Sequence, residues 1–275
     1  MTVQAVPYFS PGSKGGVFMM KYHRNSITPS EAFLIIPPFA EEMNKSRRML
    51  SKMSTELAVL GYEVIFPDLF GTGDSEGEFS KANWRVWCDD LKMIYGDLVS
   101  RGLLVNILAL RAGALLAHEL LSCEGMNFNN VVLWQPVVSG DIWLTQFLRL
   151  KLASRLFDTT DNKETTKTLK AKLDNGQFIE VAGYLVSPSL VSGMRQVRLH
   201  DLRSECCKNV LWFEVVSNED KPILTVSKSV AENWRQNVMV YTEAVVGQSF
   251  WATTEIVDVD ALVFRTISAL NLVHE

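Results

Sequence analysis

VNILALRAGALLAHELL, at residues 105–121, is the stretch that decides the fold of this 275-residue chain. Residues 105–110 follow a glycine and are almost wholly apolar, which predicts a parallel strand buried on both faces. Residues 112–121 have the composition of a helix. We therefore expect a buried strand, a tight turn and a helix in direct succession.

The turn itself reads Ala109-Leu110-Arg111-Ala112-Gly113. Small residues on both sides of a central residue are typical of a nucleophile elbow, in which a strand bends sharply into a helix. The central residue here is Arg111, whose guanidinium keeps its proton near neutral pH and cannot attack a carbonyl. A plain strand-to-helix junction with a solvated arginine would give the same pattern, so the rest of the chain has to decide.

Composition narrows the class of protein. With 47% hydrophobic and 21% charged residues, the chain can form one globular domain with a sizeable core and an insertion. A net charge of −4, without a block of basic residues, argues against nucleic-acid binding. We see no leader sequence and no apolar run of the ~18 residues that a membrane span needs, and so expect a cytoplasmic protein. The four cysteines show no CxxC pairing, so we expect free thiols, no metal and no cofactor.

Apolar runs alternate with helical segments along the chain, which predicts an α/β fold with an eight-stranded, mostly parallel sheet and helices on both faces. The first two strands should form an antiparallel hairpin. The expected strands are residues 3–10, 16–22, 33–36, 62–66, 105–110, 131–134, 210–216 and 238–245, and the expected helices are residues 46–60, 83–99, 112–121, 225–234 and 260–270. Residues 39–44 are expected to be a polar loop. Residues 141–206 break the rhythm and should form a helical lid insertion on a single-domain core of residues 1–140 and 207–275.

This order of elements, with an insertion after the sixth strand, resembles the α/β-hydrolase fold. The loop Asp68-x-x-Gly71-x-Gly73-x-Ser75 is similar to the loop that follows the fourth strand in that superfamily. The resemblance implies an enzyme scaffold whose nucleophile position is occupied by Arg111.

A narrower resemblance covers nearly the whole chain, and it is to the exosortase A system-associated hydrolase 2 family. It implies an arginine at the elbow and a place beside bacterial exopolysaccharide and exosortase functions. It is carried by PPFAEEMNKSRRM from Pro37, GDSEGEFSKANWRVW from Gly73, LALRAGALLA from Leu108, LWQPVVSG from Leu133, FLRLKLA from Phe147, AGYLVSP from Ala182 and GQSFW from Gly247.

A serine hydrolase needs a nucleophile, a histidine after the last strand, an acid that orients it, and two backbone N–H groups for the oxyanion. The run 247–251, where the superfamily would place the histidine, contains none. Asp220 could still supply the acid, and the oxyanion amides map to Phe39 and Ala112. The Ser-His-Asp triad is therefore not intact, although the anion-binding half of the machinery remains.

Two functions stay open. The first is a non-catalytic or atypical ligand-binding accessory component of a bacterial exosortase or exopolysaccharide system. The alternative is a carboxylic-ester or thioester hydrolase with an unrecognised nucleophile, for which Ser139 is the candidate; Ser75 lies in a turn that is more typical of capping. The four histidines, His23, His118, His200 and His274, each have an ordinary structural explanation.

Arg111 can serve a ligand or the fold. A guanidinium at a helix N-terminus offers bidentate geometry to a small anionic or acyl ligand. It can instead be neutralised by a protein carboxylate, and a ligand could displace that partner. Elbow geometry would hold Arg111 at positive φ at a cost of about 1–3 kcal/mol. We therefore expect an ion pair with Glu41 or Glu42 before Asp220, and the amides of Phe39 and Ala112 facing the same cavity.

The first lid helix carries an apolar stripe flanked by basic residues. Such a helix usually covers a pocket or a core, but it can also lie on an anionic membrane surface and so contact export machinery. The oligomeric state is left open. The stripe consists of Trp143, Leu144, Phe147, Leu148, Leu152 and Leu156, beside Arg149, Lys151 and Arg155.

Overall fold

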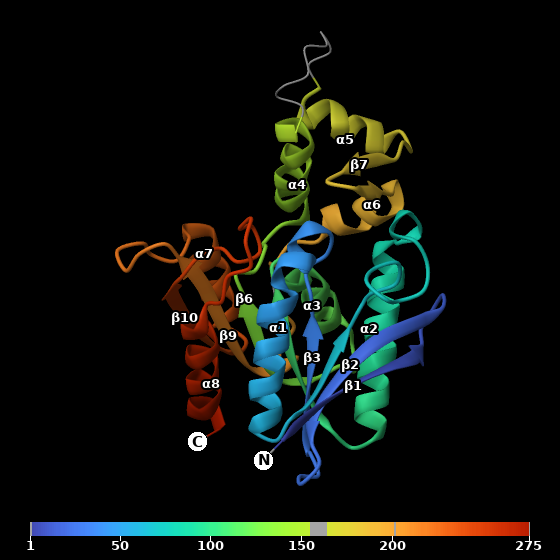
Figure 1. Cartoon of the computed structure of the whole chain (residues 1–275). Helices are drawn as coiled ribbons and strands as arrows, with labels where there is room; N and C mark the ends of the chain where they lie inside the picture. The colour runs from blue at the N-terminus through green and yellow to red at the C-terminus, as the bar shows by residue number, and fades with distance from the viewer. Residues whose placement is uncertain (1, 155–163, 201, 275) are drawn as a thin grey trace.

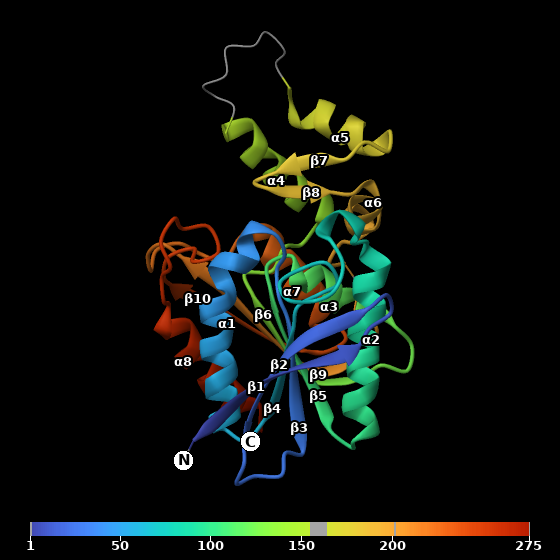
Figure 2. The same cartoon turned by 45° about the vertical axis from the view of Figure 1, so that its right-hand side comes forward.

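A computed structural model describes residues 2–154, 164–200 and 202–274 of the protein. The sheet consists of β1 (Val3–Pro11), β2 (Gly16–Arg24), β3 (Glu31–Ile36), β4 (Glu63–Pro67), β5 (Leu104–Leu110), β6 (Phe128–Trp134), β9 (Cys207–Val216) and β10 (Met239–Val246). Their order is β1-β2-β4-β3-β5-β6-β9-β10 (strands labelled in Figures 1 and 2). β2 is antiparallel to β1 and to β4, and the other pairs are parallel. The expected eight-stranded, mostly parallel sheet is confirmed.

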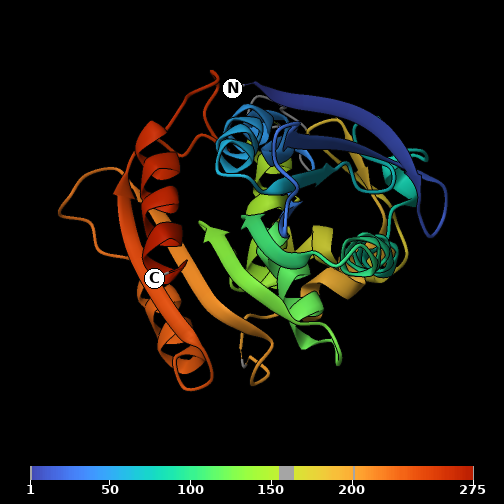
Figure 3. The same cartoon turned by 90° about the horizontal axis from the view of Figure 1, so that it is seen from below.

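Helices cover both faces of the sheet, as Figure 3 shows from below. α1 (Glu41–Val59) and α8 (Asp260–His274) pack on one face, and α2 (Trp84–Ser100), α3 (Gly113–Ser122) and α7 (Thr225–Trp234) pack on the other. Two apolar cores result, because successive side chains of the inner strands point to opposite faces. β5, for example, sends Ile107 to one core and Leu108 to the other.

The clearest departure from the sequence expectation is the start of α1. Residues 39–44 were expected to be a loop, but the helix already begins at Glu41. Glu41 and Glu42 occupy its first turn, where carboxylates interact favourably with the partial positive charge of a helix N-terminus. Two adjacent acids were read as a polar loop, whereas in this position they stabilise a helix and extend it over the end of the sheet.

The segment between β6 and β9 lies above the carboxyl ends of the strands (Figures 1 and 2). It contains α4 (Gly140–Ser154), α5 (Thr166–Asp174), β7 (Ile179–Val181), β8 (Tyr184–Val186) and α6 (Pro188–Gln196). The chain enters and leaves it side by side, because Ser139 pairs with Arg198 in an antiparallel bridge and Gly140 N donates to the Val197 carbonyl at 3.0 Å. This segment is attached to the sheet by a short two-stranded stem.

Asp141, at the first turn of α4, connects the lid helices. Its carboxylate accepts from Lys170 Nζ of α5 at 2.8 Å and from Arg195 Nε of α6 at 2.9 Å. The hydrogen bond from Lys170 is the main reason why the pKa of Asp141 lies below its ordinary value. A lowered pKa means that this stabilisation is complete above the ordinary aspartate pKa and is lost as the pH falls through the lowered one.

The apolar stripe of α4 points inward. Trp143, Leu144, Phe147 and Leu148 are all buried in the larger core, whereas Leu156 and Arg155 lie outside the described residues. The described part of the stripe therefore covers a core, and contact with a membrane surface stays a prediction. Among the described residues, no helix is both long and apolar enough to cross a bilayer.

The loop from Asp68 to Ser75 is held in place by a network of hydrogen bonds. The buried Asp68 carboxylate accepts from Arg47 Nη2 at 2.6 Å and from the Asp74 amide at 3.0 Å. The Ser75 hydroxyl accepts from the Phe18 amide of β2 at 2.7 Å. Ser75 is thus engaged in holding the loop to the sheet, in agreement with the capping interpretation.

Gly113 follows the predicted turn, and its hydrogen atoms face the end of β3. A Cβ at this position would lie 2.3 Å from the Ile36 carbonyl oxygen and 2.8 Å from that of Pro37. Because both contacts are with backbone, neither can be relieved by a side-chain rotation. The close approach of α3 to β3 therefore requires glycine here.

We predict that Gly113→Ala lowers the free energy of unfolding by about 1–3 kcal/mol, because the added methyl group must displace β3. The matched control is Gly96→Ala in α2, where a Cβ would meet nothing within 4 Å and should be neutral or stabilising by up to about 1 kcal/mol. Urea unfolding of the three proteins measures both effects. A Gly113→Ala midpoint equal to that of the wild type would refute the close packing.

Candidate functional site

Arg111 stands in the elbow position between β5 and α3, with φ at 53°. Its amide donates to the Trp134 carbonyl at 3.0 Å, and its carbonyl accepts from Val137 and Ala114 at 3.1 Å each. These bonds join the turn to the end of β6 and to the first turn of α3. The left-handed conformation expected from the sequence is confirmed.

The ion pair expected for Arg111 is formed with Glu42. Nε and Nη2 of Arg111 both donate to Oε1 of Glu42, at 3.1 and 3.0 Å. The side chains are only 14% and 18% exposed, so the pair is screened less than a surface pair would be. Glu41 instead faces Lys45 at 3.4 Å, and Asp220 is exposed in the loop after β9, so Glu42, one of the two partners expected first, forms the pair.

The second oxygen of Glu42 contacts the lid. Trp143 Nε1, on α4, donates to Glu42 Oε2 at 3.4 Å. The Trp143 ring stacks on Phe147 with 4.8 Å between centroids and packs against Phe39 at 4.4 Å. Glu42 thus links the elbow arginine to the lid through one carboxylate.

An aromatic ring from the far end of the chain completes the surroundings of Arg111. The guanidinium lies over Trp251 at 5.2 Å from the ring centroid, which allows a cation–π interaction. Trp251 belongs to the connection between β10 and α8, in the run where the superfamily would place its histidine.

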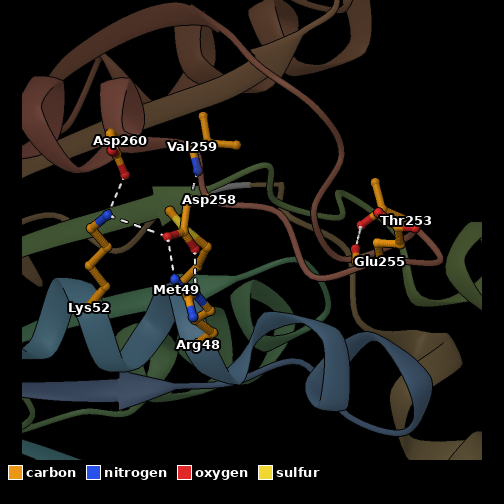
Figure 4. Close-up of polar contacts among 8 residues, drawn as sticks. All are labelled: Arg48, Met49, Lys52, Thr253, Glu255, Asp258, Val259 and Asp260. Carbon is orange, nitrogen blue, oxygen red and sulfur yellow. Dashed lines mark hydrogen bonds and ion pairs between the residues drawn. The ribbon is translucent and has the colours of Figure 1, made fainter.

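That connection is fixed to α1 by charged contacts (Figure 4). Arg48 donates to both oxygens of Asp258, at 2.7 and 2.9 Å, and Lys52 pairs with Asp258 and Asp260. The Val259 amide also contacts Met49 Sδ at 3.3 Å. α1 therefore carries Glu42 and also holds the connection that supplies Trp251.

These groups line a cavity of about 190 Å³ between the core and the lid. Its lining is Glu41, Glu42, Lys45, Arg111, Trp143, Gln146, Phe147, Leu150, Trp251 and Ala252. Among the described residues, no protein group accepts a hydrogen bond from Nη1 of Arg111. The cavity thus has aromatic and aliphatic walls and one open guanidinium edge.

Backbone strain gathers at the same edge of the sheet. Ala40, Arg111 and Gln135 follow β3, β5 and β6 and have φ values of 56°, 53° and 42°. A non-glycine residue held at positive φ costs about 1–3 kcal/mol of folding free energy, and such residues cluster at functional sites. Three strained turns on neighbouring strands mark this edge as the candidate site.

Phe39 and Ala112 are buried and are not among the residues that line the cavity. The Phe39 ring fills the space between Trp87 and Trp143 instead. That both amides face the cavity of Arg111 and bind a ligand there stays a prediction.

The alternative catalytic groups lie apart from the cavity. Ser139 is buried in the lid stem, where its carbonyl accepts from Trp143 N at 3.0 Å. His23 is on β2, His118 of α3 stacks on Trp234 of α7, and His200 lies between α6 and β9. None of these three residues lines the cavity. The side chain of His274 lies outside the described residues. No group of three metal-binding side chains occurs in the described part of the chain.

Several lining residues were not predicted as site residues. Trp143 was assigned to an apolar stripe, and Trp251 was noted only as occupying the histidine region. Lys45 lies one turn after Glu41, so an early start of α1 would have indicated it. Gln146 and Leu150 lie on the exposed edge of α4, and no feature of the sequence marks them as lining residues.

No protein-family model matches the sequence, and no protein of curated function matches it. Solved structures do match. Est1E from Butyrivibrio proteoclasticus, described with bound ferulic acid, has a TM-score of 0.64 at 12% identity over 96% of this chain and 98% of that chain. Alpha/beta hydrolase domain-containing protein 10 from mouse has a TM-score of 0.61 at 14% identity, over 98% of this chain and 100% of that chain. A soluble variant of monoglyceride lipase from Saccharomyces cerevisiae has a TM-score of 0.62 at 12% identity, over 97% of this chain and 93% of that chain.

Together with the strand order and the elbow, these likenesses show that the protein has the α/β-hydrolase fold. At such low identity the likeness extends to the fold alone. The narrower resemblance to the exosortase-associated family is not confirmed by the comparisons.

We predict that Arg111→Ser lowers the free energy of unfolding by about 1–3 kcal/mol. The estimate lies between the values for exposed and buried pairs, because Glu42 would be left without its partner in a partly exposed site. Lys45→Ser is the control, since its exposed pair with Glu41 should contribute no more than about 0.5 kcal/mol. Chemical denaturation of both variants decides the matter. Equal stability of Arg111→Ser and wild type would show that the pair does not support the fold.

Proposed function

We propose that this α/β-hydrolase-fold protein binds a small acyl or carboxylate ligand beside Arg111 and does not hydrolyse it. The observation that carries the proposal is the elbow itself, where a guanidinium paired with Glu42 occupies the place of a nucleophile. Ester hydrolysis by the usual route needs an attacking oxygen and a base at this turn. Arg111 supplies neither.

The cavity indicates the class of ligand. Its four ionisable lining residues, Glu41, Glu42, Lys45 and Arg111, carry formal charges that cancel, so net charge does not select the ligand. Selection instead rests on hydrogen bonding, because Nη1 of Arg111 is a donor and needs a carbonyl or carboxylate oxygen. The aromatic and aliphatic walls suit a short hydrocarbon tail.

The biological setting is proposed from sequence resemblance alone. Stretches such as LALRAGALLA from Leu108 support a role as an accessory component of a bacterial exosortase or exopolysaccharide system. Contact with export machinery belongs to the same proposal.

Hydrolysis by Ser139 is the competing function, and the esterases and lipases among the similar folds are compatible with it. Its burial in the lid stem, away from the cavity of Arg111, favours the binding function.

We predict that hexanoate binds saturably and that 1-hexanol, which lacks the carboxylate, binds at least about tenfold more weakly. Tryptophan fluorescence reports binding, since Trp143 and Trp251 line the cavity. Arg111→Met should weaken hexanoate binding by a similar factor. Phe178→Ala is the control, because Phe178 is exposed on the lid and does not line the cavity. Equal binding of acid and alcohol would contradict the role of Arg111.

We also predict no turnover of p-nitrophenyl butyrate by the wild type or by Arg111→Ser, because no described histidine lies beside the turn to activate the new hydroxyl. The release of p-nitrophenol measures this directly. Activity that copurifies with the wild type and disappears in Ser139→Ala would establish the competing hydrolase function.

A further inference from the structure

A second cavity, of about 500 Å³, lies beyond the carboxyl ends of β6 and β9. Its lining is Gln135, Glu214, Val215, Val216, Ser217, Lys221, Pro222, Ile223, Leu224, Thr225 and Ser249. It shares no lining residue with the cavity of Arg111. Ligands of parallel α/β sheets commonly bind at this edge.

Glu214 is the unusual residue in this cavity. It lies near the end of β9 in an otherwise apolar run and is only 1% exposed. Its Oε2 accepts from the Leu224 amide at 2.8 Å, but its buried Oε1 has no hydrogen-bond partner among the described residues. A buried carboxylate oxygen without a donor is costly, so a donor from outside the chain would stabilise it.

Capping of α7 accounts for only one of the two carboxylate oxygens of Glu214. Leu224 is the N-cap residue of α7, and a negative charge at a helix N-terminus is favourable. Oε2 alone makes that contact. The buried, unpartnered Oε1 therefore points to a further partner.

Gln135 supplies a second, independent indication. It is held at a φ of 42°, and its Oε1 accepts from the Val215 amide at 2.7 Å. With the carbonyl end used, the side-chain amide still has N–H groups to offer. Ser217 and Ser249 add hydroxyl-bearing residues to the lining, beside five apolar residues.

We propose that this cavity binds a small polar primary amine whose ammonium group donates to Glu214 Oε1. An ammonium group provides both the missing hydrogen bond and the countercharge of a buried carboxylate. Hydroxyl or carbonyl groups of the ligand then meet Gln135 and the two serines. The site is independent of the ligand proposed for Arg111.

The probe is 2-aminoethanol, compared with ethane-1,2-diol, in which a hydroxyl replaces the ammonium group. Titrations are followed through the backbone amide resonances of Leu224 and Val215, which report on Glu214 and Gln135. We expect saturable shifts with 2-aminoethanol and at least about tenfold weaker binding of the diol, since charge-assisted hydrogen bonds are the stronger ones. Equal binding of the two compounds would overturn the proposal.

Glu214→Gln removes the charge and keeps an oxygen for the Leu224 amide, so we expect at least about tenfold weaker binding of 2-aminoethanol. Glu219→Gln, an exposed acid in the same connection that does not line the cavity, should bind as the wild type does. Lys221→Met removes the cation that lines the cavity and should strengthen binding. Unchanged affinity in Glu214→Gln, or no saturable binding in both wild type and Lys221→Met, would overturn the proposal.

Discussion

The left-handed turn at Arg111 is the constraint on which the rest of the structure depends. Its amide donates to the Trp134 carbonyl at the end of β6, and its carbonyl accepts from the Val137 amide just beyond that strand. The turn brings α3 so close to β3 that Gly113 has no room for a side chain. The strain of the turn is offset where Arg111 reaches Glu42. That contact exists only because α1 starts at Glu41 and so extends over the sheet edge.

Much of this could be predicted from sequence because the signals are local. The apolar run before Arg111 and the small residues around it give the strand, the turn and its positive φ. The partner Glu42 followed from the need to neutralise a buried guanidinium near an acidic segment. Where the sequence expectation failed, tertiary contacts decide. Asp220 lies on an exposed loop, and α1 begins at Glu41, within the stretch that was expected to be a polar loop.

Three of the residues that sequence reasoning missed come from distant segments of the chain. Trp143 belongs to the lid, Trp251 to the last connection, and Glu214 to an inner strand. Trp251 is positioned through Asp258 and Arg48, a contact across 210 positions that no local pattern reveals. Glu214 does leave a trace, since one acid interrupts an otherwise apolar strand. That one of its carboxylate oxygens lacks a hydrogen-bond partner can be recognised only from the structure, in which the end of β9 lies beside the start of α7.

The stem of the lid gives the lid a mechanical connection to the turn. Val137 donates to the carbonyl of Arg111, and two residues further on Ser139 pairs with the returning chain at Arg198. The strained turn and the lid are thus joined twice, once through the main chain of the stem and once through the hydrogen bond from Trp143 to Glu42. Both connections end at Arg111 or at the carboxylate that pairs with it.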